Sequence, residues 1–294
     1  MNIFVLEMTN VITFPRLITF LHDFGVQTIN IIDMDDTYIK ITGISNTNDA
    51  YIEFKLLKDK FTQVSINNII PININVTKLH YMFSGNVLDT SNKLALIYIK
   101  NDQNQYILNV DIYHDHLKAH MSVYQNNVNI GQMDIPTITL DDADAKYLIY
   151  INEIKNICTN CKILGFKKIK ITMLDYTIKF EGIDTHIQYE QFYDKAAIDY
   201  HVNSEHNVSG TYNLHHLLKL SELDLKGDRY MYMSNDSALI IVFESYIGEI
   251  RTMLYPYSTT IDGQIVNEID NESEKECGSE NSYNYDYDNI EIQI

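Results

Sequence analysis

The sequence predicts an α+β fold built from two similar halves. Many short stretches alternate apolar and polar residues, as strands do, whereas only a few show the apolar spacing of a helix. A helical pattern that begins at Asn75 recurs in the second half at Asn213. Hydrophobic residues make up 45% of the 294 residues, which is enough to bury a large core and excludes a wholly disordered chain.

Alternation between apolar and polar residues predicts strands along most of the chain. The clearest lie at Tyr38–Thr42, Tyr51–Leu56, Lys168–Thr172, Tyr176–Phe180 and Arg229–Ser234. A Ser-Asn-Asp-Ser step at 234–237 separates the last of these from the apolar run ALIIVF. Such residues favour tight turns, so this region is predicted to form a hairpin.

Four helices are predicted, and two of them carry the internal repeat. Their approximate ranges are 15–25, 75–84, 149–161 and 212–220. The first has proline in its first turn and glycine at its exit, the usual asymmetry of helix ends. The second and fourth each begin with asparagine and place apolar residues one, four and seven positions later. This spacing puts one apolar face of each helix on a sheet.

The charge of the chain is strongly acidic and unevenly distributed. Its 22 basic and 40 acidic residues give a net charge of −18, and only three residues are arginine. This balance argues against a protein that grips DNA phosphates over its whole surface, but it leaves room for a local positive stripe. Residues 258–294 contain ten acids and one lysine and lack apolar periodicity over most of their length, which predicts a disordered acidic tail.

Secretion and membrane insertion are not expected. The first residues lack a basic leader and carry Glu7 within their apolar stretch, and no run of 18 apolar residues occurs. Three cysteines do not make a disulfide framework. The simplest expectation is an intracellular soluble protein.

Four stretches then point to one family. They read PRLITFLHDF at 15–24, ININVTKLHYMFSGN at 72–86, INEIKNI at 151–157, and YNLHHLLKLSEL with YMYMSNDSALIIVFESYIGEIRTMLYPYS within 212–258. In these stretches the chain resembles the PCNA-type DNA sliding clamps, as a divergent and viral member. The last stretch is the most specific, because the family has there a leucine-rich helix, a serine-bracketed hairpin and a closing strand that ends in proline. The resemblance covers about residues 1–257.

The resemblance implies two tandem clamp domains, each with two helices packed on antiparallel sheets. The expected division is an N-terminal domain at 1–123, a connecting loop at 124–139, a C-terminal domain at 140–257 and the acidic tail at 258–294. In the family, three chains close into a ring whose helices line the hole. Ring closure would pair an edge strand near Lys118–Tyr124 with one near His186–Phe192 of the next chain.

The implied function is that of a DNA polymerase processivity factor in DNA replication and repair. Such a homotrimer encircles double-stranded DNA without sequence preference and docks a polymerase and other replication proteins through their short peptides. A clamp loader, no cofactor, no membrane and no enzymatic activity go with it, at the nucleus or a cytoplasmic viral replication site. The alternative is a clamp-fold adaptor of a viral replication or late-transcription complex that does not encircle DNA.

The resemblance also assigns two sets of site residues. The DNA-facing candidates are Arg16, His22, Lys78, Lys155, Lys162, His215, His216 and Lys219. The candidates for the partner-peptide pocket are Ile44, Tyr51, Val128, Ile130, Met133, Ala238, Met253 and Pro256. The alternative for the first set is ordinary solvated helix residues, and for the second it is plain core packing. The DNA-facing lining is sparse, since the aligned residues Tyr81, Ser84, Asn152 and Glu222 are not basic.

Three motifs suggest an enzyme or a metal site, but each has a simpler interpretation. Cys158 and Cys161 form a CxxC without a second ligand pair, so small residues at a helix end are the better interpretation. His114 and His116 have the spacing for one face of a strand, but no carboxylate partner is identifiable, and a polar loop is favoured. The acids at 141–144 suit a helix start. No nucleotide-binding or hydrolase motif occurs.

Overall fold

The computed structural model describes most of the chain outside its acidic tail. The described residues are 2–9, 13–33, 35–66, 72–84, 93–103, 105–114, 117–125, 140, 143–174, 177–184, 187–193, 201–202, 207–223, 227–235, 237–257 and 290–293. They form an α+β fold with four α-helices and large antiparallel sheets, as predicted. Among them, no helix has both the length and the apolar character needed to cross a membrane.

The first half of the chain contains two of the helices. In order, its elements are β1 (Asn2–Met8), α1 (Thr13–Asp23), β2 (Val26–Asp33), β3 (Tyr38–Ser45), β4 (Ala50–Leu57), the short 3-10 helix η1 (Lys58–Lys60), β5 (Gln63–Ile66), β6 (Ile72–Asn75), α2 (Val76–Phe83), β7 (Lys93–Lys100), β8 (Tyr106–His114) and β9 (Leu117–Gln125).

The second half repeats this order, and one further strand follows it. Its elements are β10 (Ala145–Leu148), α3 (Ile151–Ile163), β11 (Lys168–Met173), β12 (Ile178–Ile183), β13 (Tyr189–Tyr193), β14 (His201–Val202), β15 (Val208–Asn213), α4 (Leu214–Glu222), β16 (Arg229–Met233), β17 (Leu239–Ser245) and β18 (Gly248–Leu254). Of the acidic tail, the structure describes Ile290–Gln293, which form β19.

The strand pairings show that the two halves are built alike. β1 pairs with β5 and β7 as β10 pairs with β14 and β16. β2 pairs with β3 and β6 as β11 pairs with β12 and β15, and β3 pairs with β4 as β12 pairs with β13. The meander β7-β8-β9 matches β16-β17-β18. The internal repeat inferred from Asn75 and Asn213 therefore extends over the whole of each half.

Three sheets result, and the largest joins the halves. Their strand orders are β19-β9-β8-β7-β1-β5, β14-β10-β16-β17-β18-β4-β3-β2-β6 and β13-β12-β11-β15. In the nine-stranded sheet, β18 of the second half pairs with β4 of the first half over seven residue pairs. Gly248 opens β18 with φ +134°, and a Cβ there would lie 1.9 Å from the carbonyl oxygen of Lys55. This position accepts only glycine, because any side chain would force the two strands apart.

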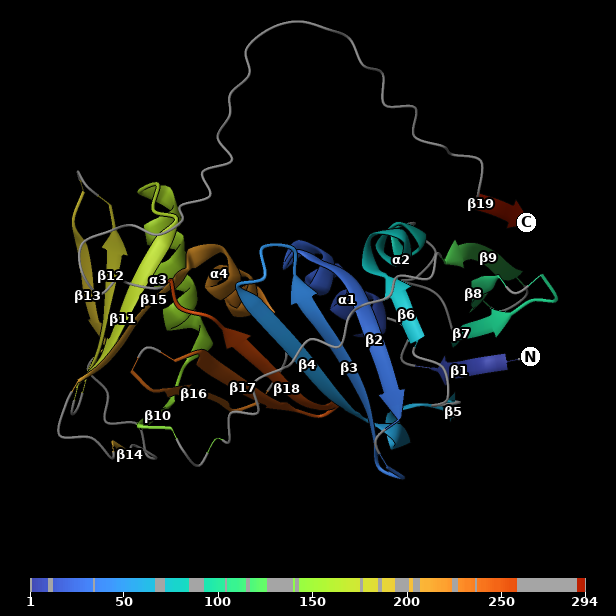
Figure 1. Ribbon diagram of the computed structural model, residues 1–294, viewed down its shortest axis with the longest axis horizontal. Coiled ribbons are helices and arrows are strands. Elements are labelled where there is room, and N and C mark those ends of the chain that lie inside the picture. Colours follow the sequence, from blue (N-terminus) through green and yellow to red (C-terminus); the bar gives the residue numbers. More distant parts are fainter. Residues whose placement is uncertain are drawn as a thin grey trace, which may run out of the picture.

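The helices form one layer against the sheets. Figure 1 shows α3, α4, α1 and α2 in a row along the upper side of the molecule, with the sheets below and at both ends. α1 packs on α2 and α3 packs on α4. Each helix turns an apolar stripe inward, and in α1 this stripe consists of Phe14, Leu17, Ile18, Phe20 and Leu21. The opposite, polar side of the row is left exposed.

The repeated asparagines are helix caps. The side chain of Asn75 accepts a hydrogen bond from the backbone N–H of Lys78 at 2.8 Å, and that of Asn213 accepts one from His215 at 3.0 Å. Each satisfies a donor that the first turn of a helix otherwise leaves without a partner. The repeat in the sequence thus records the same local requirement at the start of α2 and of α4.

Candidate nucleic-acid interface and partner site

The exposed side of α1, α2, α3 and α4 is called here the helix face. Its charged residues are Arg16, Asp23, Lys78, Glu153, Lys155, Lys162, Lys219 and Glu222. Five cations and three acids leave an excess of two positive charges, in a chain whose net charge is −18. The helix face is therefore locally positive in an acidic protein, which makes it the part of the described surface best suited to phosphate.

The helix-face cations fall into two groups. Arg16, Lys155 and Lys162 are exposed, and so is Lys78, whose Nζ donates to the backbone oxygen of Tyr124 at 3.3 Å. Lys219 is instead half-buried, and its Nζ lies 2.9 Å from a carboxylate oxygen of Glu222 and 3.5 Å from one of Asp23. The hydrogen bond with Glu222 raises the pKa of Lys219. Its charge is thus already neutralised within the protein, and it contributes less to attracting a phosphate.

Histidines extend the polar side of the same helices. His22 at the end of α1 and His80 on α2 stack with ring centroids 4.2 Å apart and an interplanar angle of 9°. His215 at the start of α4 is exposed, and its Nε2–H donates to the backbone oxygen of Asp23 at 2.9 Å. The structure thus brings His22 and His215, both predicted to face DNA, to one region. His80 was not among the sequence candidates, although it lies two residues after Lys78.

His216 does not belong to the helix face, and its assignment as a DNA-facing residue is wrong. Its side chain is only 3% exposed and packs against Phe24, with ring centroids 4.5 Å apart. Its Nε2 donates to Asp49 of the first half at 2.8 Å. The rotation of the helix turns residue 216 toward the core while it turns His215 outward. His216 therefore joins the two halves instead of meeting solvent.

A groove of about 670 Å³ runs along the helix face between α1 and α4. Its polar lining includes Arg16, Thr19, Asp23, Lys219 and Glu222. One wall comes from each half of the chain, so the groove lies where the two halves meet. Acidic and basic side chains alternate in it, which suits a moving polyanion better than a tightly held one.

The opposite face of the nine-stranded sheet carries an apolar group that we call the outer cluster. It consists of Tyr51, Ala238, Ile240, Val242 and Met253, with Ile44, Leu140, Tyr232 and Tyr255 packed against it. Tyr51, Ala238 and Met253 are almost fully buried, and Ile44 is half-buried. Neighbouring residues such as Ile52 and Ile241 point to the main core on the other side of the sheet. Four of the predicted pocket residues are thus brought together.

The rest of the predicted pocket lies apart or was missed by sequence reasoning. Pro256 follows β18 and is half-buried, and it is not a member of the outer cluster. Val128, Ile130 and Met133 lie outside the described residues. The residues missed were Leu140, Tyr232, Ile240, Val242 and Tyr255. The strand period offered a signal for two of them, because Ile240 and Val242 continue the alternation that begins at Ala238.

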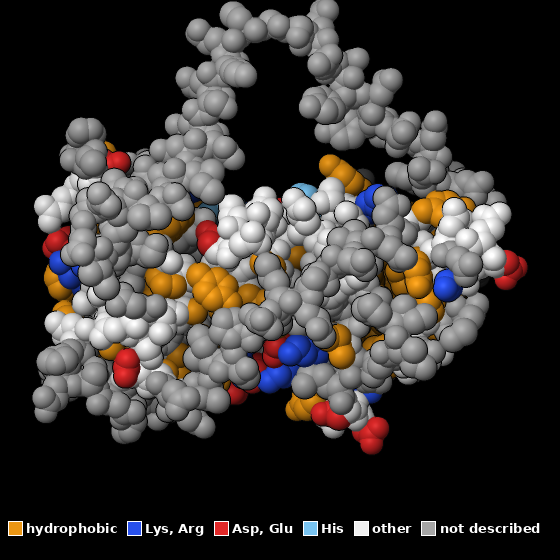
Figure 2. Space-filling view, in the orientation of Figure 1, with side chains coloured by type: hydrophobic (Ala, Val, Ile, Leu, Met, Phe, Trp, Pro, Cys, Tyr) orange, Lys and Arg blue, Asp and Glu red, His pale blue; other side chains and the backbone are white. Residues whose placement is uncertain are grey.

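Beside the outer cluster, the same sheet face is charged. Lys40 pairs with Glu53 at 2.6 Å, and Glu249 pairs with Lys55 and Arg251, each at 3.2 Å. Figure 2 shows basic and acidic side chains side by side at the lower middle of the molecule. Burial raises the pKa of Glu53, but its bonds with Lys40 outweigh this effect and the net pKa is lowered. These cations are therefore committed to internal ion pairs, unlike the exposed ones of the helix face.

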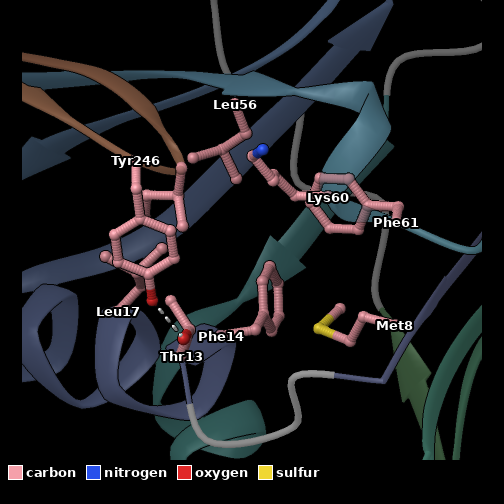
Figure 3. Close-up of a pocket in the computed structure, with 9 residues that line it drawn as sticks. Met8, Thr13, Phe14, Leu17, Leu56, Lys60, Phe61 and Tyr246 are labelled. Atoms are coloured by element: carbon pink, nitrogen blue, oxygen red, sulfur yellow. Dashed lines mark hydrogen bonds between the residues drawn. The ribbon is translucent and has the colours of Figure 1, made fainter.

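A small apolar cavity of about 90 Å³ lies at the end of the joint between the halves (Figure 3). Met8, Phe14 and Leu17 meet Leu56 and Ile247 there. At its rim, the hydroxyl groups of Thr13 and Tyr246 lie within 3.0 Å of each other. The lining offers no pair of acid and base groups and is best described as a packing gap.

The motifs that suggested chemistry are not assembled into a site. Cys158 and Cys161 are both buried, and burial raises the pKa of both thiols, to about 11 for Cys161. His120 pairs with Asp111 and Ser122 within one sheet, while the side chains of His114 and His116 lie outside the described part of the chain. Among the residues the structure describes, no group of three or more His, Cys, Asp or Glu side chains is arranged to hold a metal ion.

Comparison with known proteins identifies the fold. No protein-family model and no curated protein sequence matches the chain. A crystal structure of proliferating cellular nuclear antigen from Entamoeba histolytica matches it with a TM-score of 0.69 at 16% sequence identity, covering 88% of this chain and 100% of that one. PCNA from Thermococcus kodakaraensis matches with a TM-score of 0.67 at 14% identity, covering 86% and 100%. The chain therefore has the fold of the PCNA-type clamps.

Proposed function

We propose that this protein is a sliding clamp that encircles double-stranded DNA and tethers a polymerase and other replication proteins to it. One observation carries the proposal. Within the chain, the halves join by pairing β18 with β4. The equivalent strands of the repeat are β9 and β13, and they lie in different sheets of one chain. A second copy can supply the same joint between chains, and repetition of a joint with a fixed rotation closes a ring.

The two strands have the character of an interface. β13 is the edge of its sheet, and the side chain of Phe192 on it is 55% exposed. Ile183 and Ile187 nearby are also exposed. Large apolar side chains beside an open strand edge favour pairing with another chain. β9 carries β19 on its outer edge, in antiparallel register from Ile290 opposite Val123 to Gln293 opposite His120. Ring closure through β9 therefore requires β19 to leave.

The other features support distinct parts of the role. The helix face would line the hole of a homotrimer and meet phosphates, which needs only weak, sequence-independent attraction. The outer cluster, together with the connecting segment 124–139, would dock short peptides of partner proteins. The domains would then be 1–123 and 140–257, followed by the tail at 258–294. The protein would act as a scaffold inside the cell, with a clamp loader to open the ring.

The helix-face assignment is tested by exchanging two exposed cations for acids. In the double variant Lys78→Glu, Lys155→Glu, affinity for a short duplex should fall at least about tenfold at low salt, since each lost phosphate contact also reduces the salt slope by about 0.9. A matched control is Lys60→Glu, Lys100→Glu, which changes the net charge equally but lies outside the helix face. Equal loss in both variants would show a general charge effect and refute the assignment.

A second candidate is a clamp-fold adaptor that does not encircle DNA. The small positive excess on the helix face and the position of β19 on β9 favour it. Such an adaptor would remain a monomer or dimer and would bind partner peptides at the outer cluster without binding duplex DNA. Light scattering and duplex binding, measured on one preparation, separate the two candidates.

A further inference from the structure

The stacked pair of His22 and His80 lies between α1 and α2 on the helix face. The rings are nearly parallel, with centroids 4.2 Å apart, and neither is buried: the side chain of His22 is 34% exposed, and His80 is half-buried. Nδ1 of His80 lies 3.4 Å from the hydroxyl of Thr19, and its Nε2 lies 3.4 Å from that of Ser84. Hydroxyl groups satisfy a neutral ring and leave it free to gain a proton.

The charged surroundings of this pair come from three helices. Asp23 is 3.3 Å from Nδ1 of His22 and is the nearest acid, and Lys219 of α4 shares that acid at 3.5 Å. His215 of α4 donates to the backbone of the same residue. The phenol of Tyr81 on α2 flanks His80 at 6.1 Å between centroids. One acid thus faces two stacked imidazoles and one lysine, so the site lacks negative charge for both rings to be protonated.

Two parallel imidazoles in contact repel each other once both are charged. Burial and the neighbouring His22 lower the pKa of His80, so the pair carries at most one proton at neutral pH. A phosphate group set over the rings would supply the missing negative charge. Binding of an anion and uptake of protons are then linked, because each favours the other by the same free energy.

We propose that His22 and His80 form a phosphate contact of the helix face and that DNA binding there takes up protons. This inference rests on the proposed function, because it assumes that the helix face meets DNA. It adds a site that neither the sequence pattern nor the fold assigns. The helix face has an excess of two positive charges when its imidazoles are neutral, and protonation of His22, His80 and His215 raises the excess to five. The attraction for DNA should therefore increase as the pH falls.

The test measures duplex affinity of the full chain between about pH 8 and about pH 6, a range in which histidine titrates. We expect the affinity of the unmodified protein to rise at least about tenfold across this range. The double variant His22→Gln, His80→Gln should bind with nearly constant affinity, because glutamine keeps the polarity without the charge. The variant His80→Lys should bind tightly at both ends of the range.

Two controls assign the effect to this pair. His120→Gln removes an imidazole that belongs to β9, and it should keep the full pH dependence. His215→Gln should keep most of it, and loss of the pH dependence in His215→Gln alone would overturn the assignment. Thermal unfolding of each variant checks that it is folded.

The possible outcomes separate this inference from the proposed function. Tight binding whose affinity does not change with pH would overturn the inference and leave the proposed function intact. Absence of duplex binding at both ends of the range would overturn both. Proton uptake is measured independently by calorimetry in two buffers that differ in their ionisation enthalpy, and a difference between the two binding enthalpies is the expected result.

Discussion

Asp49 is the residue that most directly ties the two halves together. Its carboxylate accepts hydrogen bonds from His216 at 2.8 Å and from Asn213 at 2.9 Å, both in the second half, and from the hydroxyl groups of Ser45 and Thr47 in its own turn. Its backbone oxygen accepts one from Tyr255 at 2.8 Å. Burial raises the pKa of Asp49, but these bonds, with that from His216 the largest, hold the net pKa well below its usual range.

Replacing Asp49 with asparagine should lower the free energy of unfolding by about 2 kcal/mol, because charge-assisted bonds between the halves are lost. Because the pKa of Asp49 is lower in the folded state, its contribution is fully present above about pH 4 and is lost as the pH falls further. Urea denaturation at neutral and acidic pH measures both effects. Asp59→Asn, at an exposed carboxylate, is the control. Equal stability of the two variants would contradict this account.

The paired cysteines should be inert in the folded protein. Cys158 and Cys161 are buried, and their raised pKa values keep both thiols protonated near neutral pH. In a Cys277→Ser background, which removes the remaining cysteine, a thiol reagent should label both residues only at the rate at which the protein unfolds. Rapid labelling under native conditions would show that the motif is accessible and would reopen a redox interpretation.

At the residue scale, the sequence predicted types of position better than individual roles. Arg16, Lys78, Lys155 and Lys162 are exposed because charged residues on amphipathic helices face solvent. His216 was misassigned since its burial depends on Asp49, which is 167 positions away in the sequence. No local pattern carries such a contact, and the stack of His22 on His80 was missed for the same reason.

At the element scale, β9 and its partner β19 offer the clearest test. The pairing sets backbone groups of Ile290–Gln293 against residues 120–123. Ile292→Pro should disrupt it, because proline removes a backbone donor and fits poorly within a strand. Backbone amides of β9 should then exchange with solvent at least about tenfold faster, and self-association should increase.

A matched control for this prediction lies in the same tail. Ser279→Pro places proline outside β19 and should leave the exchange of β9 unchanged. Hydrogen exchange followed by mass spectrometry resolves the β9 peptide in both variants. Equal protection of β9 in the two variants would mean that β19 does not cover this edge in solution.

The elements themselves were largely predictable from local patterns. The four helices were placed within about two residues, because capping residues and apolar spacing act over a few positions. The hairpin of β16 and β17 was also predicted, and its turn is closed by a bond from Ser237 N–H to the Ser234 oxygen at 3.2 Å. The pairing of β18 with β4 carries no local signal, since it joins residues some two hundred positions apart. Resemblance to a family supplied what periodicity could not.

At the scale of the whole molecule, the structure is a repeat with one joint made and one joint left to a neighbour. β18 on β4 makes the first, and β9 with β13 is its counterpart. The duplicated α+β architecture was predicted from the sequence, whereas the contact of β19 with β9 was not. An acidic segment without apolar periodicity predicts no structure, and strand addition at an edge depends mainly on backbone bonds that composition does not reveal.

The most direct measurement is the molar mass of the full chain in solution, by light scattering over a wide range of concentration. If β9 of one chain pairs with β13 of the next, the mass should rise from one chain and level off at three times 34.2 kDa. A mass that stays at one chain, stops at two, or grows without limit would contradict a closed ring of three chains.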